Sequence, residues 1–194
     1  MLEDKLVTTN DGSHTLFSLK YNQHFHNTED GGFSEALHKH IIPAFSNSYN
    51  KKELNILDIC FGLGYNSFAT IFYILENKLD IKINIYSPEL DFDLIKSLQN
   101  FSYPKEFEKF KNIINQLSLN QKYEDEKIKI EVFIGDAREY LKTFPKDFFD
   151  IVYQDAFSSE VNKELWTKEY FEDIYKISKE DSILTTYAIS TNIR

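Results

Sequence analysis

The sequence predicts an α/β fold, in which a largely parallel sheet carries helices on both of its faces. From residue 55 onward, short apolar segments of strand type alternate with segments of helical periodicity. Such alternation is typical of βαβ units, whose parallel strands are joined by crossing helices. A Gly-x-Gly turn also joins the first strand of this series to its helix, as in folds that bind ligands at the carboxyl ends of their strands.

The composition is that of one globular domain. The chain has 194 residues, of which 42% are hydrophobic and 15% aromatic, which is enough for a core. A single cysteine excludes an intrachain disulfide and fits a reducing, cytoplasmic setting. The acidic start is unlike a signal peptide, and no apolar run is long enough to span a membrane. The net charge of −9 argues against a broad electrostatic grip on nucleic acid but leaves recognition through shape and a pocket open.

The first fifty residues have their own pattern. Residues 6–20 hold two short β-type runs around Asn10-Asp11-Gly12, which predicts a hairpin. Residues 33–46 are expected to form a helix with Ser34 as its cap and Pro43 near its end. The chain therefore starts with a β-hairpin and helix extension.

The rest of the chain alternates regularly. Phe68, Ile71, Phe72 and Leu75 have the spacing of a buried helix face. Strands are predicted at 55–60, 82–87, 128–134, 149–154 and 182–188, helices at 65–77, 91–100, 105–119, 137–143 and 168–178, and a solvated turn at 123–129.

The loops after Cys60, Ser87, Ile134 and Gln154 follow parallel strands, so we expect them to converge on one ligand site. The first contains Gly62 and Gly64, where the backbone can turn sharply near a ligand. Ser67 stands where a dinucleotide motif would have its third glycine, so the turn is a weak signal for NAD or FAD. A tight strand–helix turn without a ligand is an equally good interpretation.

Three acids follow the other strands. Glu89 could accept hydrogen bonds from both hydroxyls of a ribose, with Asp91 as a competitor and an ordinary solvated acid as the alternative. Asp136, before Ala137, could accept from an adenine amino group or cap a helix. Asp155 stands where a reacting group belongs, or caps a turn. Their order, after the glycines, fits an adenosyl ligand, with the glycines making room for the methionine end of S-adenosylmethionine.

Histidines and aromatic residues give weaker signals. All five histidines lie between His14 and His40, and two pairs have i,i+2 spacing, but no cysteine or acidic ligand cluster joins them, so we predict no metal site. Cys60 and Trp166 are interpreted as core residues. The side chains that could stack on a flipped base are Tyr21, Phe25, Phe157 and Tyr187.

Three segments now identify a resemblance: "LDICFGLGYNSF", "VFIGDAREYL" and "DIVYQDAFSSEVNKELWTKEYF". They resemble the methyltransferase domain of the MnmC family, the tRNA 5-methylaminomethyl-2-thiouridine biosynthesis proteins. The leader "TTNDGSHTLFSLKYNQHFHNTEDGGFSEALHKHII" is similar as well, so the match spans nearly the whole chain. The segment after Asp155 is the specific part, whereas the glycine loop is common to many methyltransferases.

The resemblance implies a Rossmann-like class I methyltransferase fold and S-adenosylmethionine-dependent N-methylation of the aminomethyl group on wobble uridine 34 of tRNA. It implies two parts of one structural unit, an extension over the cofactor site (residues 1–50) and the methyltransferase domain (51–194). Asp155 would face the amine, and the histidines would line the pocket mouth or contact the anticodon loop. The implied cofactor residues are Asp58, which orders the glycine loop, Phe61, Gly62, Gly64 and Asn66 at the methionine end, Glu89 at the ribose, and Asp136 and Ala137 at the adenine.

The sequence departs from the family pattern in two ways. Cys60, Leu63 and Tyr65 replace the first glycine, the threonine and the leucine of the usual G-F-G-T-G-L-N-F loop. The chain also lacks the last helix and strand pair expected of this fold, and the FAD-dependent oxidase domain of many bacterial members. No FAD is therefore expected in this chain, and a separate oxidase protein is a candidate supplier of the amine. The alternatives are a polyamine-synthase-like aminopropyltransferase and an inactive, truncated methyltransferase-like domain.

Overall fold

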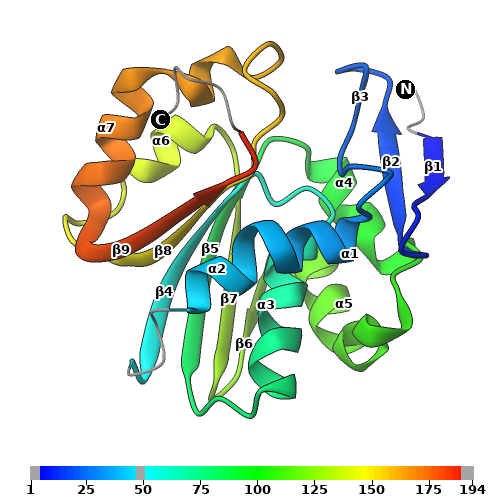
Figure 1. Ribbon diagram of the computed structural model, residues 1–194, viewed down its shortest axis with the longest axis horizontal. Helices are drawn as coiled ribbons and strands as arrows, with labels where there is room; N and C mark the ends of the chain where they lie inside the picture. Colours follow the sequence, from blue (N-terminus) through cyan, green and yellow to red (C-terminus); the bar gives the residue numbers. More distant parts are fainter. Residues whose placement is uncertain (1–4, 47–50, 189–194) are drawn as a thin grey trace.

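The computed structural model describes residues 5–46 and 51–188. Its main sheet has six strands in the order β6-β7-β5-β4-β8-β9, and all neighbours are parallel except β6 and β7 (Figure 1). The predicted α/β fold with a largely parallel sheet is confirmed. The strands are β4 (Glu53–Ile59), β5 (Lys82–Glu89), β6 (Lys122–Glu124), β7 (Ile128–Ile134), β8 (Phe149–Gln154) and β9 (Ser178–Thr186).

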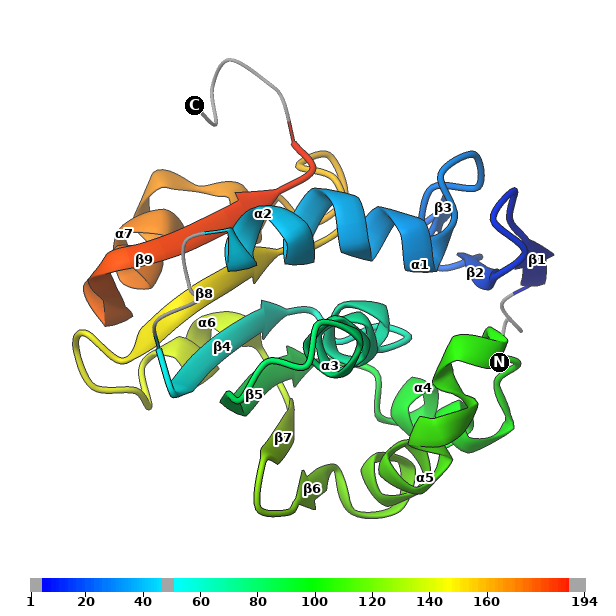
Figure 2. The ribbon, with the colours of Figure 1, turned by 60° about the horizontal axis from the view of Figure 1, so that its bottom comes forward.

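Helices cover both faces of this sheet, as Figure 2 shows. One face packs against α6 (Ala137–Leu141) and α7 (Lys168–Ile177), and the other packs against α3 (Tyr65–Glu76), α4 (Phe92–Ser97) and α5 (Lys111–Asn120). Alternation along β4 divides its side chains between these faces, with Leu54 and Ile56 in one buried cluster and Leu57 and Ile59 in the other. Short 3₁₀ segments complete the connections: η2 (Leu98–Asn100), η3 (Lys105–Phe110) and η4 (Lys163–Trp166).

The N-terminal residues form a second, antiparallel sheet of β1 (Lys5–Thr8), β2 (His14–Ser18) and β3 (Gln23–His24). The predicted hairpin is present, and Gly12 adopts the positive φ of 81° that its turn requires. A helical segment follows, made of α1 (Gly32–Glu35), the π-helix η1 (Ala36–Ile41) and α2 (Ile42–Phe45). It packs against α3 and β9.

Ser34 does not cap this helical segment, so that prediction was wrong. The helix begins at Gly32, and its N-cap residue Gly31 makes no side-chain cap bond. Asp11 takes the capping role from the hairpin turn, because its Oδ2 accepts the N–H of Ser34 at 3.0 Å. A carboxylate distant in sequence thus satisfies an N–H group that has no partner within the helix.

The strand β6 was also missed. Residues 123–129 were predicted to be a solvated turn, but Lys122, Tyr123 and Glu124 pair with β7. Three residues are too few to show a period, and this pairing depends on a neighbouring strand. Strand β9 begins four residues before its predicted start at 182, because the polar residue Ser178 leaves α7 directly in an extended conformation.

Two predictions concern residues that the structure does not describe. The predicted boundary between residues 50 and 51 adjoins the undescribed residues 47–50, and the prediction about the final elements of the fold concerns the chain after residue 188, so both lie outside the described residues. Within residues 5–46 and 51–188, no helix is long and apolar enough to cross a membrane.

Candidate active site

A cavity of about 1100 Å³ lies at the carboxyl end of the parallel strands. The loops after β4, β5, β7 and β8 converge on it, as predicted, and β2, β3 and the helical segment contribute the opposite wall. The predicted site residues that line it are Phe61, Gly62, Asn66, Glu89, Asp136, Ala137 and Asp155. Gly64 and Asp58 are not in the lining.

The glycine loop is shaped by backbone conformation. Gly62 and Gly64 have φ values of 54° and 75°, in the left-handed region that favours glycine. A Cβ on Gly64 would come within 2.6 Å of the Phe68 ring, so this glycine is required by packing beneath the cavity. Gly62 faces the cavity, where a Cβ would lie 3.4 Å from the Phe25 ring. Of the two, Gly62 therefore makes the close backbone approach that a ligand could use.

Cys60 packs against the buried cluster that contains Leu57 and Ile59 but is also partly exposed at the cavity, so its interpretation as a core residue holds in part. Burial of its sulfur within the loop raises the pKa of the thiol well above its usual value, which makes it a poor nucleophile.

Asp58 organises the start of α3. Its side chain lies on the α3 side of β4 and accepts hydrogen bonds from Ser67 Oγ at 2.8 Å and Asn66 Nδ2 at 3.2 Å. Burial raises the pKa of Asp58 to about 7, against the opposing effect of the Ser67 hydrogen bond. Asn66 donates its other amide hydrogen to Asp155 Oδ2 at 2.8 Å, so this amide links the two carboxylates.

Glu89 ends β5 and joins two loops. Its Oε2 accepts the N–H of Gly62 and its Oε1 accepts the N–H of Asp91, each at 2.9 Å. Burial raises the pKa of Glu89, although these backbone bonds oppose the shift. The competitor Asp91 caps α4 by accepting the N–H of Leu94, so Glu89 is the carboxylate available at the strand end.

Asp136 has both of its predicted features, since it lines the cavity and caps α6 through the N–H of Arg138 at 2.8 Å. The Arg138 side chain also binds both carboxylate oxygens, and these bonds lower the pKa of Asp136. An adenine amino group would therefore share this carboxylate with Arg138. The neighbouring Ala137 is buried at the start of α6.

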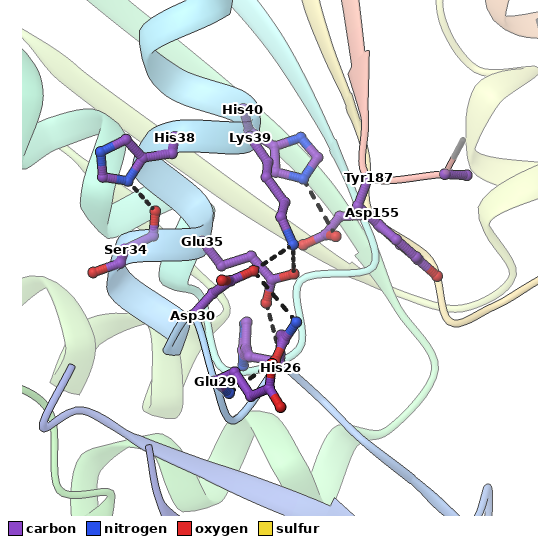
Figure 3. Close-up of polar contacts among 12 residues, drawn as sticks. His26, Glu29, Asp30, Ser34, Glu35, His38, Lys39, His40, Asp155 and Tyr187 are labelled. Carbon is purple, nitrogen blue, oxygen red and sulfur yellow. Dashed lines mark hydrogen bonds and ion pairs between the residues drawn. The ribbon is translucent and has the colours of Figure 1, made fainter. Parts of the chain in front are cut away.

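Asp155 lies at the centre of the constellation that Figure 3 shows. Besides Asn66, it faces His40, whose Nε2 lies 3.3 Å from Oδ1. Burial alone would raise the pKa of Asp155, but the neighbouring His40, with smaller contributions from His26 and the Asn66 hydrogen bond, outweighs it and the pKa is lowered. Burial would likewise lower the pKa of His40, but Asp155 raises it on balance. An ionised carboxylate with 19% of its side chain exposed therefore faces the cavity.

An ion-pair cluster stands on the same side of the cavity. Lys39 Nζ lies 2.9 Å from both Asp30 and Glu35, and Glu35 accepts the N–H of Asn27 at 2.7 Å (Figure 3). Glu35 and Lys39 line the cavity but were missed in the sequence, whereas His26 lines it as expected of the histidines. Spacing along one chain gave no signal, because these residues reach the site through the packing of the N-terminal segment against the sheet.

The loop after Asp155 is fixed by aromatic side chains. Trp166 Nε1 donates to the carbonyl of Phe157 at 2.7 Å, and the Tyr187 hydroxyl donates to that of Ala156 at 2.9 Å. Phe157 packs against the rings of Tyr21 and Phe25. Trp166 is half-buried and holds a functional loop, while the predicted stacking residues do line the cavity.

Comparison with known proteins agrees with this geometry. A family described as S-adenosyl-L-methionine-dependent methyltransferase matches residues 102–194. A solved structure described as MNMC2 from Aquifex aeolicus is similar over 97% of this chain and 60% of its own, with a TM-score of 0.86 and 28% identity. Residues 102–194 therefore carry the match to the S-adenosyl-L-methionine-dependent methyltransferases, and the similarity to MNMC2 extends over nearly the whole chain. The resemblance to the MnmC family is confirmed.

Other proteins are similar to this chain as well. An uncharacterized protein of Methanocaldococcus jannaschii is 28% identical over 195 residues, 99% of this chain and 52% of the relative. The bifunctional tRNA 5-methylaminomethyl-2-thiouridine biosynthesis protein MnmC of Leptospira interrogans is 25% identical over 80% of this chain and 26% of its own length. The chain thus spans about half the length of the first of these relatives. A probable spermidine synthase from Corynebacterium glutamicum, with 14% identity and a TM-score of 0.56, shares the fold alone.

The cavity of this methyltransferase fits the family's cofactor. Gly62 leaves space at the cavity wall that a Cβ would narrow. The carboxylate of Glu89 can accept hydrogen bonds from ribose hydroxyls. The lining contains more acids than lysines, which suits a sulfonium cation: the acids are Glu35, Glu89, Asp91, Asp93, Asp136, Asp155 and Glu164, and the lysines are Lys20 and Lys39.

The histidines divide by role. His24 and His26 line the cavity, whereas His14 and His38 contact the main-chain carbonyls of Ser102 and Ser34. Within the described ranges, no group of three or more histidine, cysteine or acidic side chains is arranged to hold a metal ion. His40 was not predicted as a site residue, yet it contacts Asp155.

Proposed function

We propose that this methyltransferase transfers a methyl group from S-adenosylmethionine to the nitrogen of an aminomethyl group on wobble uridine 34 of tRNA, forming 5-methylaminomethyl-2-thiouridine. The observation that carries the proposal is the ionised carboxylate of Asp155, which faces the cavity from the same strand-end wall as Gly62 and Glu89. The similarity to proteins named for this modification supports the choice of acceptor.

When bound, S-adenosylmethionine supplies an activated methyl group, so the reaction forms a carbon–nitrogen bond, breaks a carbon–sulfur bond and releases one proton from nitrogen. Gly62 and Glu89 would hold the donor, with Asp136 and Ala137 at the adenine. The acceptor must be a neutral amine in line with the methyl group, and holding it so supplies most of the rate. Asp155 would accept a hydrogen bond from the amine N–H and fix that direction.

The electrostatics of Asp155 define its part in the reaction. Its lowered pKa makes it a weak proton acceptor at neutral pH but a stable negative charge beside the nitrogen, where positive charge develops during transfer. The carboxylate would therefore stabilise that charge, and the proton would leave to water.

We also propose that residues 1–50 act as a cover over the cofactor cavity of the domain formed by 51–194. The support is that Phe25, His26 and Lys39 line the same cavity as the strand-end loops. Stacking of the target base between Tyr21, Phe157 and their neighbours would use this cover.

The first test is cofactor binding. Calorimetric titration of S-adenosylmethionine into the protein should show saturable binding, which should weaken roughly tenfold or more in Glu89→Gln, because the loss of charge removes an acceptor for two ribose hydroxyls. Asp93→Asn is the matched control, since Asp93 also lines the cavity but lies within α4. Equal losses in both variants would contradict the assignment of the ribose site.

The second test is methyl transfer. Labelled methyl should pass to tRNA that carries 5-aminomethyl-2-thiouridine and not to tRNA with an unmodified wobble uridine. Asp155→Asn should abolish transfer while it leaves cofactor binding within about twofold, because an amide cannot stabilise the developing charge. Transfer of an aminopropyl group from decarboxylated S-adenosylmethionine to a polyamine would instead establish the aminopropyltransferase alternative, and full turnover by Asp155→Asn would reject the role of Asp155.

A further inference from the structure

His40 contacts the reacting carboxylate from outside the methyltransferase sheet. It belongs to the π-helix of the N-terminal segment and has no exposed surface. Its Nε2 lies 3.3 Å from Asp155 Oδ1 (Figure 3), and its Nδ1 lies 2.8 Å from Thr185 Oγ1 on β9. One imidazole therefore joins the helical segment, the loop after β8 and the last described strand.

The surroundings fix the ring. Tyr153 packs against it edge-on, with centroids 5.7 Å apart and an angle of 65° between the rings. Because Thr185 occupies Nδ1, the other nitrogen is directed at Asp155. Nδ1 has a hydrogen-bond partner in Thr185, whereas the buried Nε2 has no hydrogen bond and is compensated only by the charge of the nearby Asp155 carboxylate.

The sequence explains why the helix presents His40 in this way. Pro43 has no N–H for the carbonyl of Lys39, and its ring would clash with that carbonyl in a regular α-helix. The helix widens just before Pro43, where the N–H of Ile42 donates to the carbonyl of Leu37 in a π-type bond. Such bulges are frequent at functional sites. Lys39 and His40, one residue apart in this widened turn, serve the ion-pair cluster and Asp155 respectively.

Asp155 retains acceptor capacity for a substrate. A carboxylate has about four lone-pair directions, and the hydrogen bond from Asn66 Nδ2 occupies one of them on Oδ2. His40 Nε2 approaches the other oxygen, Oδ1, at 3.3 Å as an ion pair without hydrogen-bond geometry. Catalytic contacts are often poorly aligned in this way before the substrate binds.

We propose that His40 is a positioning residue, which orients the Asp155 carboxylate toward the acceptor amine and couples the N-terminal segment to the methyl-transfer step; this inference rests on the proposed function. His40 does not line the cavity and acts through Asp155 alone.

Kinetics of His40→Gln test the role. The matched control on the same helical segment is His38→Gln, since His38 contacts the Ser34 carbonyl, points away from Asp155 (Figure 3) and does not line the cavity. His40→Gln should lower kcat roughly tenfold to a hundredfold while KM for tRNA and the Kd for S-adenosylmethionine stay within twofold, because the misplaced carboxylate affects the reacting geometry. Unchanged kcat in His40→Gln, or an equal loss in His38→Gln, would overturn the proposal.

A second measurement keeps the native His40. The imidazole of His40 is titrated by NMR in the wild type and in Asp155→Asn, where Glu35 on the same helix, Asp58 on β4, His26 and Thr185 remain. The titration midpoint should fall by about one pH unit or more when the Asp155 charge is removed, and an unchanged midpoint would overturn the pairing. The NMR titration does not require enzymatic turnover. If the wild type were inactive, the proposed function would be rejected, but the titration midpoint of His40 would still show whether His40 pairs with Asp155.

Discussion

Cys60 shows how a single residue adapts the glycine loop. Its φ of 66° lies in the left-handed region, where an L-residue is strained by roughly 1–2 kcal/mol. The pattern of the family that this chain resembles has glycine at this position, and Cys60 adopts a backbone conformation that glycine adopts freely. The substitution therefore preserves the shape of the loop and adds a sulfur to the cavity wall.

Substitutions at Cys60 test this strain. Cys60→Gly should leave the free energy of unfolding within about 0.5 kcal/mol, since the relief of strain offsets the greater chain entropy of glycine. Cys60→Val should cost about 2 kcal/mol, because a β-branched side chain tolerates positive φ poorly. Urea unfolding measures both, with Cys60→Ala as the control for loss of the thiol. Equal stabilities of the valine and alanine variants would contradict the left-handed conformation.

At the scale of elements, the hairpin turn between β1 and β2 supports the helical segment. Asp11 accepts hydrogen bonds from Ser13 N–H at 2.9 Å, from Thr9 Oγ1 at 2.8 Å and from Ser34 N–H at 3.0 Å. Partial burial opposes ionisation, but these bonds, with that from Ser13 Oγ foremost, lower the pKa of Asp11 to about 2. One ionised side chain therefore closes the hairpin turn and caps the next helix.

This pKa gives a prediction with a defined sign. Because the folded pKa lies below the unfolded value of 3.8, the ionised Asp11 stabilises the fold above about pH 4, and the contribution is lost as the pH falls toward 2. Asp11→Ala should cost on the order of 1 kcal/mol at pH 7. The difference from wild type in urea unfolding should shrink near pH 2–3. The control is Asp173→Asn, which removes only one exposed ion pair. If the stability difference between Asp11→Ala and the wild type did not change with pH, Asp11 would not be the ionised group that stabilises the fold.

The loop that carries Asp155 depends on Trp166. Replacing it by phenylalanine keeps the ring but removes the N–H that binds the Phe157 carbonyl. Trp166→Phe should lower kcat roughly tenfold through displacement of Asp155, and amide exchange across residues 155–158 should become faster. Tyr175→Phe, at an 82% exposed position on α7, is the control. Unchanged exchange in Trp166→Phe would show that the loop is held by other contacts.

The sequence predicted the helices and strands better than the tertiary contacts between them. Short apolar runs marked β4 and β8, and the spacing of the apolar residues marked α3, because burial of one helix face dictates that spacing. The strand-end acids Glu89 and Asp155 were found because parallel strands fix where their loops meet. His40 and Lys39 were not found as site residues, since their place depends on tertiary packing of the N-terminal segment. Their signal was Pro43, which marks the point where the helix widens.

For the whole molecule, the shared cavity implies that the N-terminal segment and the sheet respond to the cofactor together. Phe25 approaches Gly62, His40 pairs with Asp155, and Phe25 also packs on Phe157, so the contacts between the two parts concentrate at the site. A ligand held by both walls would add contacts to each, and binding to the folded state slows the local openings that permit amide exchange.

Hydrogen exchange with and without S-adenosylmethionine measures this coupling. We expect slower exchange at residues 60–64 and 89–91, and also at residues 23–28, which form the facing wall. The turn at residues 125–127, which connects β6 to β7 away from the cavity, provides the internal reference. Protection confined to the strand-end loops would mean that residues 1–50 do not cover the cofactor. The same exchange experiment on His40→Gln tests the route of the coupling. If both walls are protected in the wild type but residues 23–28 lose that protection in His40→Gln, the coupling depends on the contact between His40 and Asp155, because that contact joins the helical segment to the reacting loop.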